Sequence, residues 1–299
     1  YIIRRCFFIE NYATQGGALY VASNVSNTNN NECLIDRCGF FNNAAGQRGN
    51  AINAGGAIYL AGAGTVVNCA VFNNENGGIY LANKAAKVIN STITRNTASG
   101  IDGDNDTQVL NTVIWGNSTL SSDNARPAFS HCAYPEANAE DSNTGNNVYL
   151  AAKNNEEKGP HFSSPSLKTG FDTDFTLSAS NRYPLWTWEP IEATPLVDAG
   201  DNQAYDEAGY GNVDLNGDPR LQNGTIDIGA FEYQPVSTSR IRYVKQDGTG
   251  DGMSWENASG DLQRMIDELA DNNPQNLPGE VWVAAGTYEP QSQLIQGTG

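Results

Sequence analysis

The chain has 299 residues, enough for one large domain or for two of ordinary size. Its 34 Asp and Glu residues exceed its 17 Lys and Arg residues, and a net charge of −17 argues against a protein that grips phosphate backbones. No apolar run is long enough to cross a membrane, so we expect no membrane insertion and no nucleic acid partner. The 31 glycines predict many tight corners, and only one segment has helical periodicity, so the expected class is all-β.

A short repeated sequence motif, here called the refrain, organises the first part of the chain. It recurs at residues 5–11, 37–43, 68–74, 90–96 and 111–117. Counted from its second position, offsets −3 and +2 are apolar in every copy, and offset +5 is always Asn. A period of about 22 residues with fixed positions indicates stacked coils that bury one core jointly. We therefore predict a right-handed, single-stranded parallel β-helix, which is a solenoid of coils.

Two side-chain ladders are expected inside these coils. Free thiols that act as small buried side chains are predicted at the second position of the refrain, which Ser91 and Thr112 occupy in later copies: Cys6, Cys38 and Cys69. Left-handed corners and amide bonds from coil to coil are predicted at offset +5: Asn11, Asn43, Asn74, Asn96 and Asn117. Offset −3 can face inward only if the chain bends near offset −1, which predicts a corner at Arg5, Arg37, Asn68, Asn90 and Asn111.

A second refrain, rich in Gly, supplies another strand to each coil. It occurs at residues 16–21, 55–60 and 77–81, and its alternation turns the aliphatic residues inward. Tyr20, Tyr59 and Tyr80 then form an outward stripe. Such a stripe could contact sugar rings or a protein partner, or it could cover the strand face beneath an insertion. Residues 24–31 and 46–53 are predicted to be insertion loops.

The remaining segments give the expected domain order. Coils are expected at 1–183, with the start of the stack missing upstream of residue 1, further strands near 128–132 and 148–150, and closing strands near 160–162 and 175–177. Residues 184–233 are predicted to cap the stack, 234–240 to be a linker, and 241–299 to open a second β-helix. This opening segment begins with a strand at 243–245 and ends with a strand at 280–288. Between them lies a helix whose apolar face is formed by Leu262, Met265, Ile266 and Leu269.

Three parts of the sequence resemble one family. They are the coil refrains, the block from Pro195 to Tyr233, and residues 243–290. Together they resemble the right-handed parallel β-helix, pectin-lyase-like surface proteins of Bacteroidota, of the choice-of-anchor type. The resemblance implies an extracellular location at the bacterial cell surface. Because an opening segment here follows a closing segment, it also implies the end of one module joined to the start of the next, within a tandem-module fibre or adhesin. The implied partners are neighbouring β-helix modules, of the same or identical chains, and surface glycans or host surfaces.

Many β-helix proteins act on polysaccharides, so the residues that such catalysis requires would have to be present in the coils. A lyase needs clustered carboxylates that hold Ca²⁺ beside a base, and a hydrolase needs paired carboxylates. The coils hold Asp36 and Glu10 among several arginines, but no carboxylates aligned on neighbouring coils, while His131 and His161 lie outside the regular coils. We predict no catalytic residue and a structural, adhesive, non-catalytic role. The alternative is a polysaccharide lyase, a glycoside hydrolase or a glycan-binding module.

One loop is a candidate for Ca²⁺. Asp102, Asp104 and Asp106 alternate on a Gly-containing stretch, and alternating carboxylates can wrap a hard cation. The other interpretation is a solvated polar corner between coils. Asp214, Asn216 and Asp218 have the same spacing, but Pro219 and Thr225 stand where an EF-hand loop has Gly and Glu.

Overall fold

The structure is a computed structural model of the whole chain. It describes residues 1–23, 32–46, 55–104, 106–121, 126–135, 145–150, 160, 162–164, 187–190, 194–206, 211–221, 224–233, 241–271 and 279–288. The chain divides into two compact units, Tyr1–Gln234 and Pro235–Gly299, each of which is described by itself. The predicted linker and both predicted insertion loops, apart from Gly46, lie outside the described residues.

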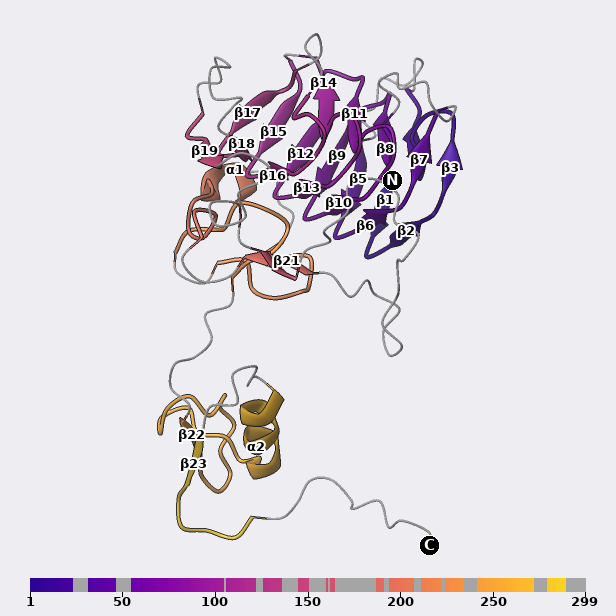
Figure 1. The fold of residues 1–299 in the computed structure, drawn as a ribbon. Coiled ribbons are helices and arrows are strands. Elements are labelled where there is room, and N and C mark those ends of the chain that lie inside the picture. Colours follow the sequence, from indigo (N-terminus) through magenta and orange to yellow (C-terminus); the bar gives the residue numbers. More distant parts are fainter. Residues whose placement is uncertain are drawn as a thin grey trace, which may run out of the picture. The chain divides into compact units, whose positions relative to one another are not determined.

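The first unit is built from parallel sheets whose strands succeed one another coil by coil (Figure 1). The first sheet has the order β1 (Ile2–Arg4), β5 (Cys33–Asp36), β9 (Gly64–Val67), β12 (Lys87–Ile89), β15 (Gln108–Leu110) and β17 (Ala128–Ser130). The second has the order β2 (Phe7–Ile9), β6 (Gly39–Phe41), β10 (Ala70–Phe72), β13 (Thr92–Thr94), β16 (Val113–Trp115), β18 (Ala133–Pro135) and β19 (Val148–Leu150). The third has the order β4 (Leu19–Val21), β8 (Ile58–Leu60), β11 (Ile79–Leu81) and β14 (Ile101–Gly103).

Two short strands, β3 (Tyr12–Ala13) and β7 (Ala44–Ala45), form a small parallel pair between the second and third sheets of the first two coils. Equivalent refrain positions pair directly, as Phe8 with Phe40 and Val71 with Ile93. The prediction of an all-β parallel solenoid is therefore confirmed. Strands β17, β18 and β19 also place further coils where they were expected.

Apolar columns run through the interior of the stack. Offset −3 supplies Ile35, Val66, Val88 and Val109, and offset +2 supplies Phe40, Val71, Ile93 and Ile114, all of them buried. The rings of Phe8 and Phe40 are stacked, with centroids 4.7 Å apart. Because neighbouring coils lie one strand spacing apart, each side chain packs on its equivalent in the next coil.

The corner at offset −1 lies where the apolar pattern predicted it. The φ angles are positive at Arg5 (55°), Arg37 (52°), Asn68 (52°), Asn90 (42°) and Asn111 (47°). His131, at the equivalent position of the next coil, has a φ of 49°. One left-handed residue bends the chain so that the strands on both sides turn an apolar side chain inward.

The Asn ladder differs from the expectation in its backbone. The left-handed residue of the second corner precedes each ladder residue, with positive φ at Glu10, Asn42, Asn73, Arg95 and Gly116. The ladder residues are held by side-chain bonds instead. The Asn43 Nδ2 atom donates to Phe8 O at 2.9 Å and to Asn74 Oδ1 at 3.0 Å, and Asn43 N donates to Asn74 Oδ1 at 2.9 Å. The predicted amide bonds between coils are therefore present, whereas the corner conformation belongs to the neighbouring residue.

The cysteine ladder does more than fill space. All five cysteines are free, and the thiols of Cys38 and Cys69 each accept a backbone N–H from the preceding coil. The Cys6 N–H donates to Cys38 Sγ at 3.4 Å, and the Cys38 N–H donates to Cys69 Sγ at 3.3 Å. Ser91 and Thr112 continue the series, because Cys69 N donates to Ser91 Oγ and Ser91 N donates to Thr112 Oγ1. The position selects a small side chain that can accept and donate hydrogen bonds, which explains why hydroxyls replace thiols there.

The segment predicted to cap the stack instead packs along its side. Leu196, Ile228 and Phe231 share an apolar cluster with Phe72 and Trp115 from the outer face of the second sheet. The segment includes α1 (Asn202–Asp206) and β21 (Thr187–Pro190), and β21 pairs antiparallel with β20 (Phe162–Ser164). Residues 175–177 lie outside the described part.

Corner side chains explain this lateral packing. Asn111 accepts from the Asp201 N–H at 2.8 Å and donates to the Asp201 carbonyl at 3.0 Å. Arg220 donates to Asn68 Oδ1 at 2.7 Å and to the Gly229 carbonyl at 2.7 Å. The outward amides at offset −1, which replace the arginines of the first two coils, therefore anchor the segment.

The second unit contains a parallel strand pair and one helix. Strands β22 (Ile241–Val244) and β23 (Glu280–Val283) pair in parallel, and α2 (Leu262–Asp271) lies between them in the chain. Met265 is buried and Leu262 and Leu269 are half-buried, whereas Ile266, predicted to share their face, is 44% exposed. In the part of the chain that the structure describes, no helix has the length and apolar character needed to cross a bilayer.

Candidate functional site

The outward tyrosines form an ordered ladder on the third sheet. Tyr20, Tyr59 and Tyr80 are the middle residues of β4, β8 and β11 and pair directly in the sheet. The aliphatic residues on either side point into the core, as Ile58 and Leu60 do. The preceding glycines allow the coils to approach, since a Cβ on Gly56 would lie 2.0 Å from the Gly77 carbonyl oxygen. The structure thus brings together the three tyrosines that the sequence predicted.

The rings stack on one another. The centroids of Tyr20 and Tyr59 are 5.2 Å apart, and those of Tyr59 and Tyr80 are 4.9 Å apart, with interplanar angles of 17° and 24°. Burial and the neighbouring phenols raise the pKa of Tyr59, and a hydrogen bond that its side chain accepts from the Gln15 side chain opposes that shift. Since each face of the middle ring is covered by its neighbour, the ladder offers edges and hydroxyl groups to a ligand rather than three free faces.

Asp102 occupies the next position of the ladder. It pairs with Tyr80 across β11 and β14 but is almost fully buried. Its carboxylate accepts hydrogen bonds from the hydroxyls of Ser99 and Ser121, the latter at 3.2 Å. Asp102 therefore belongs to the end of the tyrosine ladder and not to an open loop.

Asp104 and Asp106 face solvent beside Lys84. Lys84 forms an ion pair with Asp106 and lies 3.9 Å from Asp104, and these carboxylates raise its pKa. Lys84 and Asp106 are 22 residues apart, which is the coil period. This spacing would have allowed the ion pair to be predicted from the sequence. The three carboxylates proposed for Ca²⁺ are not brought together, and no group of three His, Cys, Asp or Glu able to hold a metal is found among the described residues.

In the second EF-hand-like stretch, the carboxylate oxygens of Asp214 are also engaged in hydrogen bonds within the protein. Asp214 Oδ1 accepts the Gly217 and Asp218 N–H groups, both at 2.9 Å, and Asp214 Oδ2 accepts the Glu232 N–H at 2.9 Å. Burial raises the pKa of the Asp214 carboxyl. This carboxylate organises the turn that carries Arg220 and Glu232.

The charged groups of the coils serve packing as well. Asp36 is buried in β5 and paired with Arg4 at 2.6 Å and Arg37 at 3.1 Å. His131 lies at a corner beside Ser130 and Asn146, with Asp201 at 3.9 Å. His161 lies outside the described residues.

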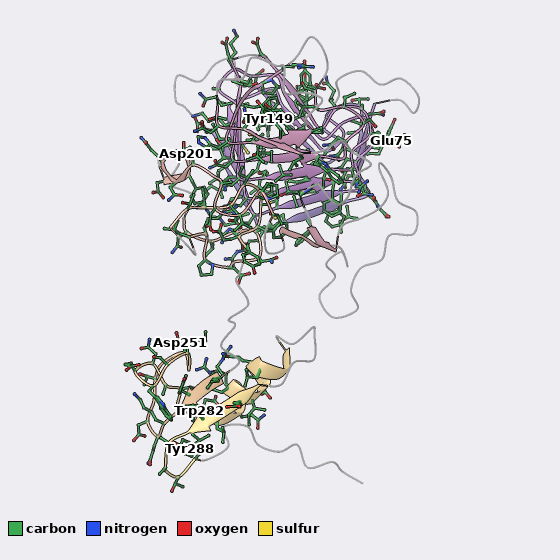
Figure 2. All side chains as sticks on the ribbon, turned by 60° about the vertical axis from the view of Figure 1, so that its left-hand side comes forward. Glu75, Tyr149, Asp201, Asp251, Trp282 and Tyr288 are labelled. Carbon is green, nitrogen blue, oxygen red and sulfur yellow. The ribbon has the colours of Figure 1, made fainter. Side chains whose placement is uncertain are left out.

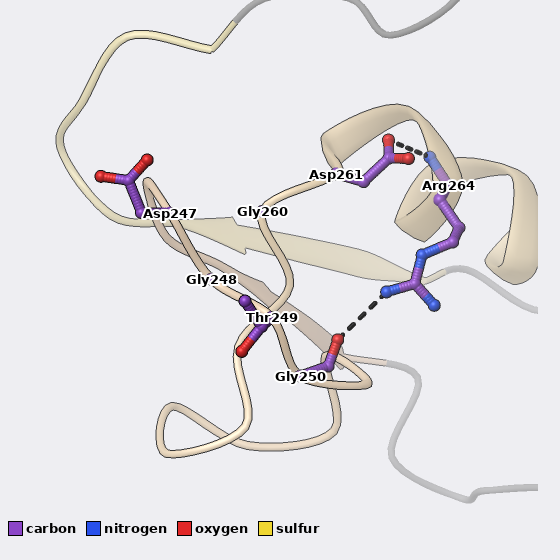
Figure 3. A pocket seen from close by; sticks show the side chains of 7 residues that line it. All are labelled: Asp247, Gly248, Thr249, Gly250, Gly260, Asp261 and Arg264. Carbon is purple, nitrogen blue, oxygen red and sulfur yellow. Dashed lines mark hydrogen bonds between the residues drawn. The ribbon is translucent and has the colours of Figure 1, made fainter.

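The second unit contains a polar hollow of about 330 Å³ beside the start of α2 (Figure 3). Asp247, Thr249, Asp261, Arg264 and neighbouring glycines line it. The Arg264 guanidinium donates to the Gly250 carbonyl at 3.1 Å, and the Arg264 N–H donates to Asp261 Oδ1 at 3.0 Å. Arg264 thus links the start of α2 to the Gly-rich turn at Gly250.

Sequence comparisons add no relative. Neither models of known protein families nor curated proteins match this chain. The fold alone therefore defines its class, an all-β parallel solenoid.

Proposed function

We propose that this chain is a structural and adhesive segment of a repetitive extracellular bacterial surface fibre and that it performs no catalysis. The observation that supports this most is that the hydrogen bonds of the Asn ladder all run in the same direction along the stack. Asn11, Asn43, Asn74 and Asn96 each donate to the Asn one coil later, so every coil is the docking surface for the next. A structure that grows by adding equivalent coils gains length without enlarging its core, as a fibre segment requires.

The extracellular bacterial location rests on the family resemblance. Buried charged groups of the first unit are used in packing, as Asp36 is with Arg37 and Arg220 is with Glu232. This favours a structural role over the alternative of a polysaccharide lyase or glycoside hydrolase, whose acid and base must face a substrate.

Glycan contact is the second candidate, and the tyrosine ladder favours it. It presents phenol edges and hydroxyls on one face, with Tyr20 48% exposed. Amphipathic rings of this kind suit an adhesive surface that contacts sugars or a protein partner. Adhesion by this face is compatible with the fibre role.

Incubation with pectic, alginate and host glycans tests both proposals. We expect no turnover, and any binding should be lost when Tyr20, Tyr59 and Tyr80 are replaced together by Ser. Tyr149→Ser is the matched control, because Tyr149 is similarly exposed but belongs to β19, outside the ladder. Release of unsaturated or reducing products would overturn the non-catalytic proposal, and glycan binding that survives the triple replacement would exclude the ladder.

A further inference from the structure

The three tyrosines of the ladder stand side by side on the outer face of the third sheet. Tyr59 of β8 pairs in register with Tyr80 of β11, and Tyr20 of β4 pairs in register with Tyr59. Each lies between two aliphatic residues that pack in the core, so all three rings leave the sheet on the same side. Parallel pairing in register places equivalent side chains one strand spacing apart. The ladder therefore holds the phenols of successive coils at close range.

Tyr59 and Tyr80 are the closer pair of the ladder. Their ring centroids are 4.9 Å apart at an interplanar angle of 24°, against 5.2 Å for Tyr20 and Tyr59. Both Tyr59 and Tyr80 are half-buried, so part of each ring remains in contact with solvent. The structure describes residues 55–104 without a gap, and both strands that carry the pair lie within this range. The geometry of the pair is thus set by two adjoining coils.

Two phenols held in this way are suited to oxidative coupling. Loss of one electron and of the hydroxyl proton converts a tyrosine into a phenoxyl radical, whose unpaired electron is shared with the ring carbons ortho to the oxygen. Two such radicals combine by forming a bond between these carbons. Free phenols must first meet in solution, whereas rings held on neighbouring strands react within one chain.

We propose that Tyr59 and Tyr80 form a cross-linking site, in which a peroxidase and hydrogen peroxide join the two rings as a dityrosine. Each phenol gives up one electron and its hydroxyl proton, and the peroxide takes up both electrons and both protons to become two molecules of water. The new bond links one ortho carbon of each ring. The hydrogen on each of these carbons then moves to the oxygen of its own ring, which restores both phenols.

A second tyrosine pair shows what distinguishes this site. The rings of Tyr134 and Tyr149 also lie close together, with centroids 5.5 Å apart, but they meet edge to face at 77°. In this arrangement the edge of one ring is directed at the face of the other, so the ortho carbons of the two rings are not brought side by side. Tyr134 is also fully buried, away from an oxidant in solution. We therefore expect no coupling of this pair.

The cross-link fastens one coil covalently to the next. It closes the loop of chain between Tyr59 and Tyr80, and a covalent closure of this kind stabilises a fold chiefly by restricting the unfolded chain. We expect the melting midpoint of the first unit to rise by at least about 5 °C. This covalent strengthening is a property beyond the fibre role and glycan contact, and it requires neither of them.

Peroxidase treatment of the full chain at low protein concentration provides the test. The product should keep the mass of a single chain, 32.1 kDa, less two hydrogen atoms, and it should acquire dityrosine fluorescence. A protease that cleaves after Glu separates the two tyrosines, because Glu75, labelled in Figure 2, lies between them in the chain. The peptides 33–75 and 76–136, which contain Tyr59 and Tyr80, should then be recovered joined to each other.

Two conservative variants control the assignment. Tyr80→Phe keeps an aromatic ring in the stack but cannot form the phenoxyl radical, so the joined peptides should disappear. Tyr149→Phe, on β19 of the second sheet (Figure 2), should give as much of them as the parent chain does. Unchanged circular dichroism before oxidation would show that both variants fold.

Three results would overturn the proposal. They are a folded parent chain that yields no joined peptides, joined peptides that persist in Tyr80→Phe, and coupling that occurs only between chains and doubles the mass. A cross-linked chain whose melting midpoint is no higher than that of the untreated chain would overturn the stabilising role of the link.

Discussion

Asn74 shows what a single ladder side chain does in this fold. It is fully buried, and its Nδ2 atom donates to the carbonyls of Phe40 and Phe72 and to Asn96 Oδ1 at 3.0, 3.0 and 2.9 Å. Its Oδ1 atom accepts the backbone and side-chain N–H groups of Asn43. One amide thus ties three successive coils together, and no apolar residue of similar size can do the same.

Replacing this residue should therefore weaken the stack. We expect Asn74→Leu to lower the free energy of unfolding by about 2–4 kcal/mol, because buried backbone groups lose their partners. Chemical denaturation of the first unit measures the loss. Asn11→Leu is the control at the exposed end of the same ladder, where we expect less than about 1 kcal/mol. Equal losses at the two positions would contradict the account.

A second residue-scale effect concerns Asp227. Burial raises the pKa of its carboxyl to about 6, although the N–H groups of Asp198 and Tyr233 favour the anion. In the unfolded chain an Asp has a pKa of about 3.9. The folded protein therefore binds this proton more tightly than the unfolded chain does.

The sign of the pH dependence follows. As pH falls from about 6 to about 4, Asp227 takes up its proton in the folded state first, so this residue adds stability, by at most about 1.4 kcal/mol per pH unit. Asp227→Asn removes the titration, so the difference in unfolding free energy between parent and variant should grow as pH falls through that window. A difference that is constant with pH would show that the carboxyl does not titrate there.

At the scale of elements, Arg220 links the lateral segment to the coils. It is 1% exposed, bonds to Asn68 and Gly229, and lies 3.6 Å from Glu232. Arg220→Met should lower the stability of the first unit by about 3 kcal/mol, because the buried Glu232 carboxylate loses the positive charge of Arg220 beside it. The double variant with Glu232→Gln should lose less than the sum of the single losses. The control, Arg264→Met in the second unit, should leave this transition unchanged.

The elements also show how much of the fold can be predicted from the sequence. The apolar residues at offsets −3 and +2 predicted the inward columns. They also required a bend at offset −1, and the positive φ angles of the residues there, from Arg5 in the first coil to Asn111 in the fifth, show that bend. The lateral packing of Leu196, Ile228 and Phe231 could not be predicted from the sequence, because it depends on a hydrogen bond between Asn68 and Arg220, which lie far apart in the chain. At the candidate site the sequence predicted that the tyrosines point outward. It did not predict that their rings stack or that Asp102 is buried, because both depend on the spacing of the coils. The exposure of Ile266 likewise depends on how α2 is rotated against its strands.

At the scale of the whole molecule, the two units have separate cores. The buried column of the first unit includes Ile93, and that of the second centres on Val244 and Met265. Stability follows the contacts within each core, so a substitution in one core should act on one unfolding transition only.

Two matched large-to-small substitutions, one in each core, test whether the two units unfold independently. Ile93→Ala should lower the first unit's stability by about 2–4 kcal/mol, and Met265→Ala should lower the second unit's stability, because each leaves a cavity in a filled core. Calorimetry should show two transitions, and amide exchange at residues 79–115 and 241–269 should assign each of them. Each variant should shift its own transition alone. If Met265→Ala also shifted the first transition, the two cores would be energetically coupled within one chain, and separate units would be the wrong description.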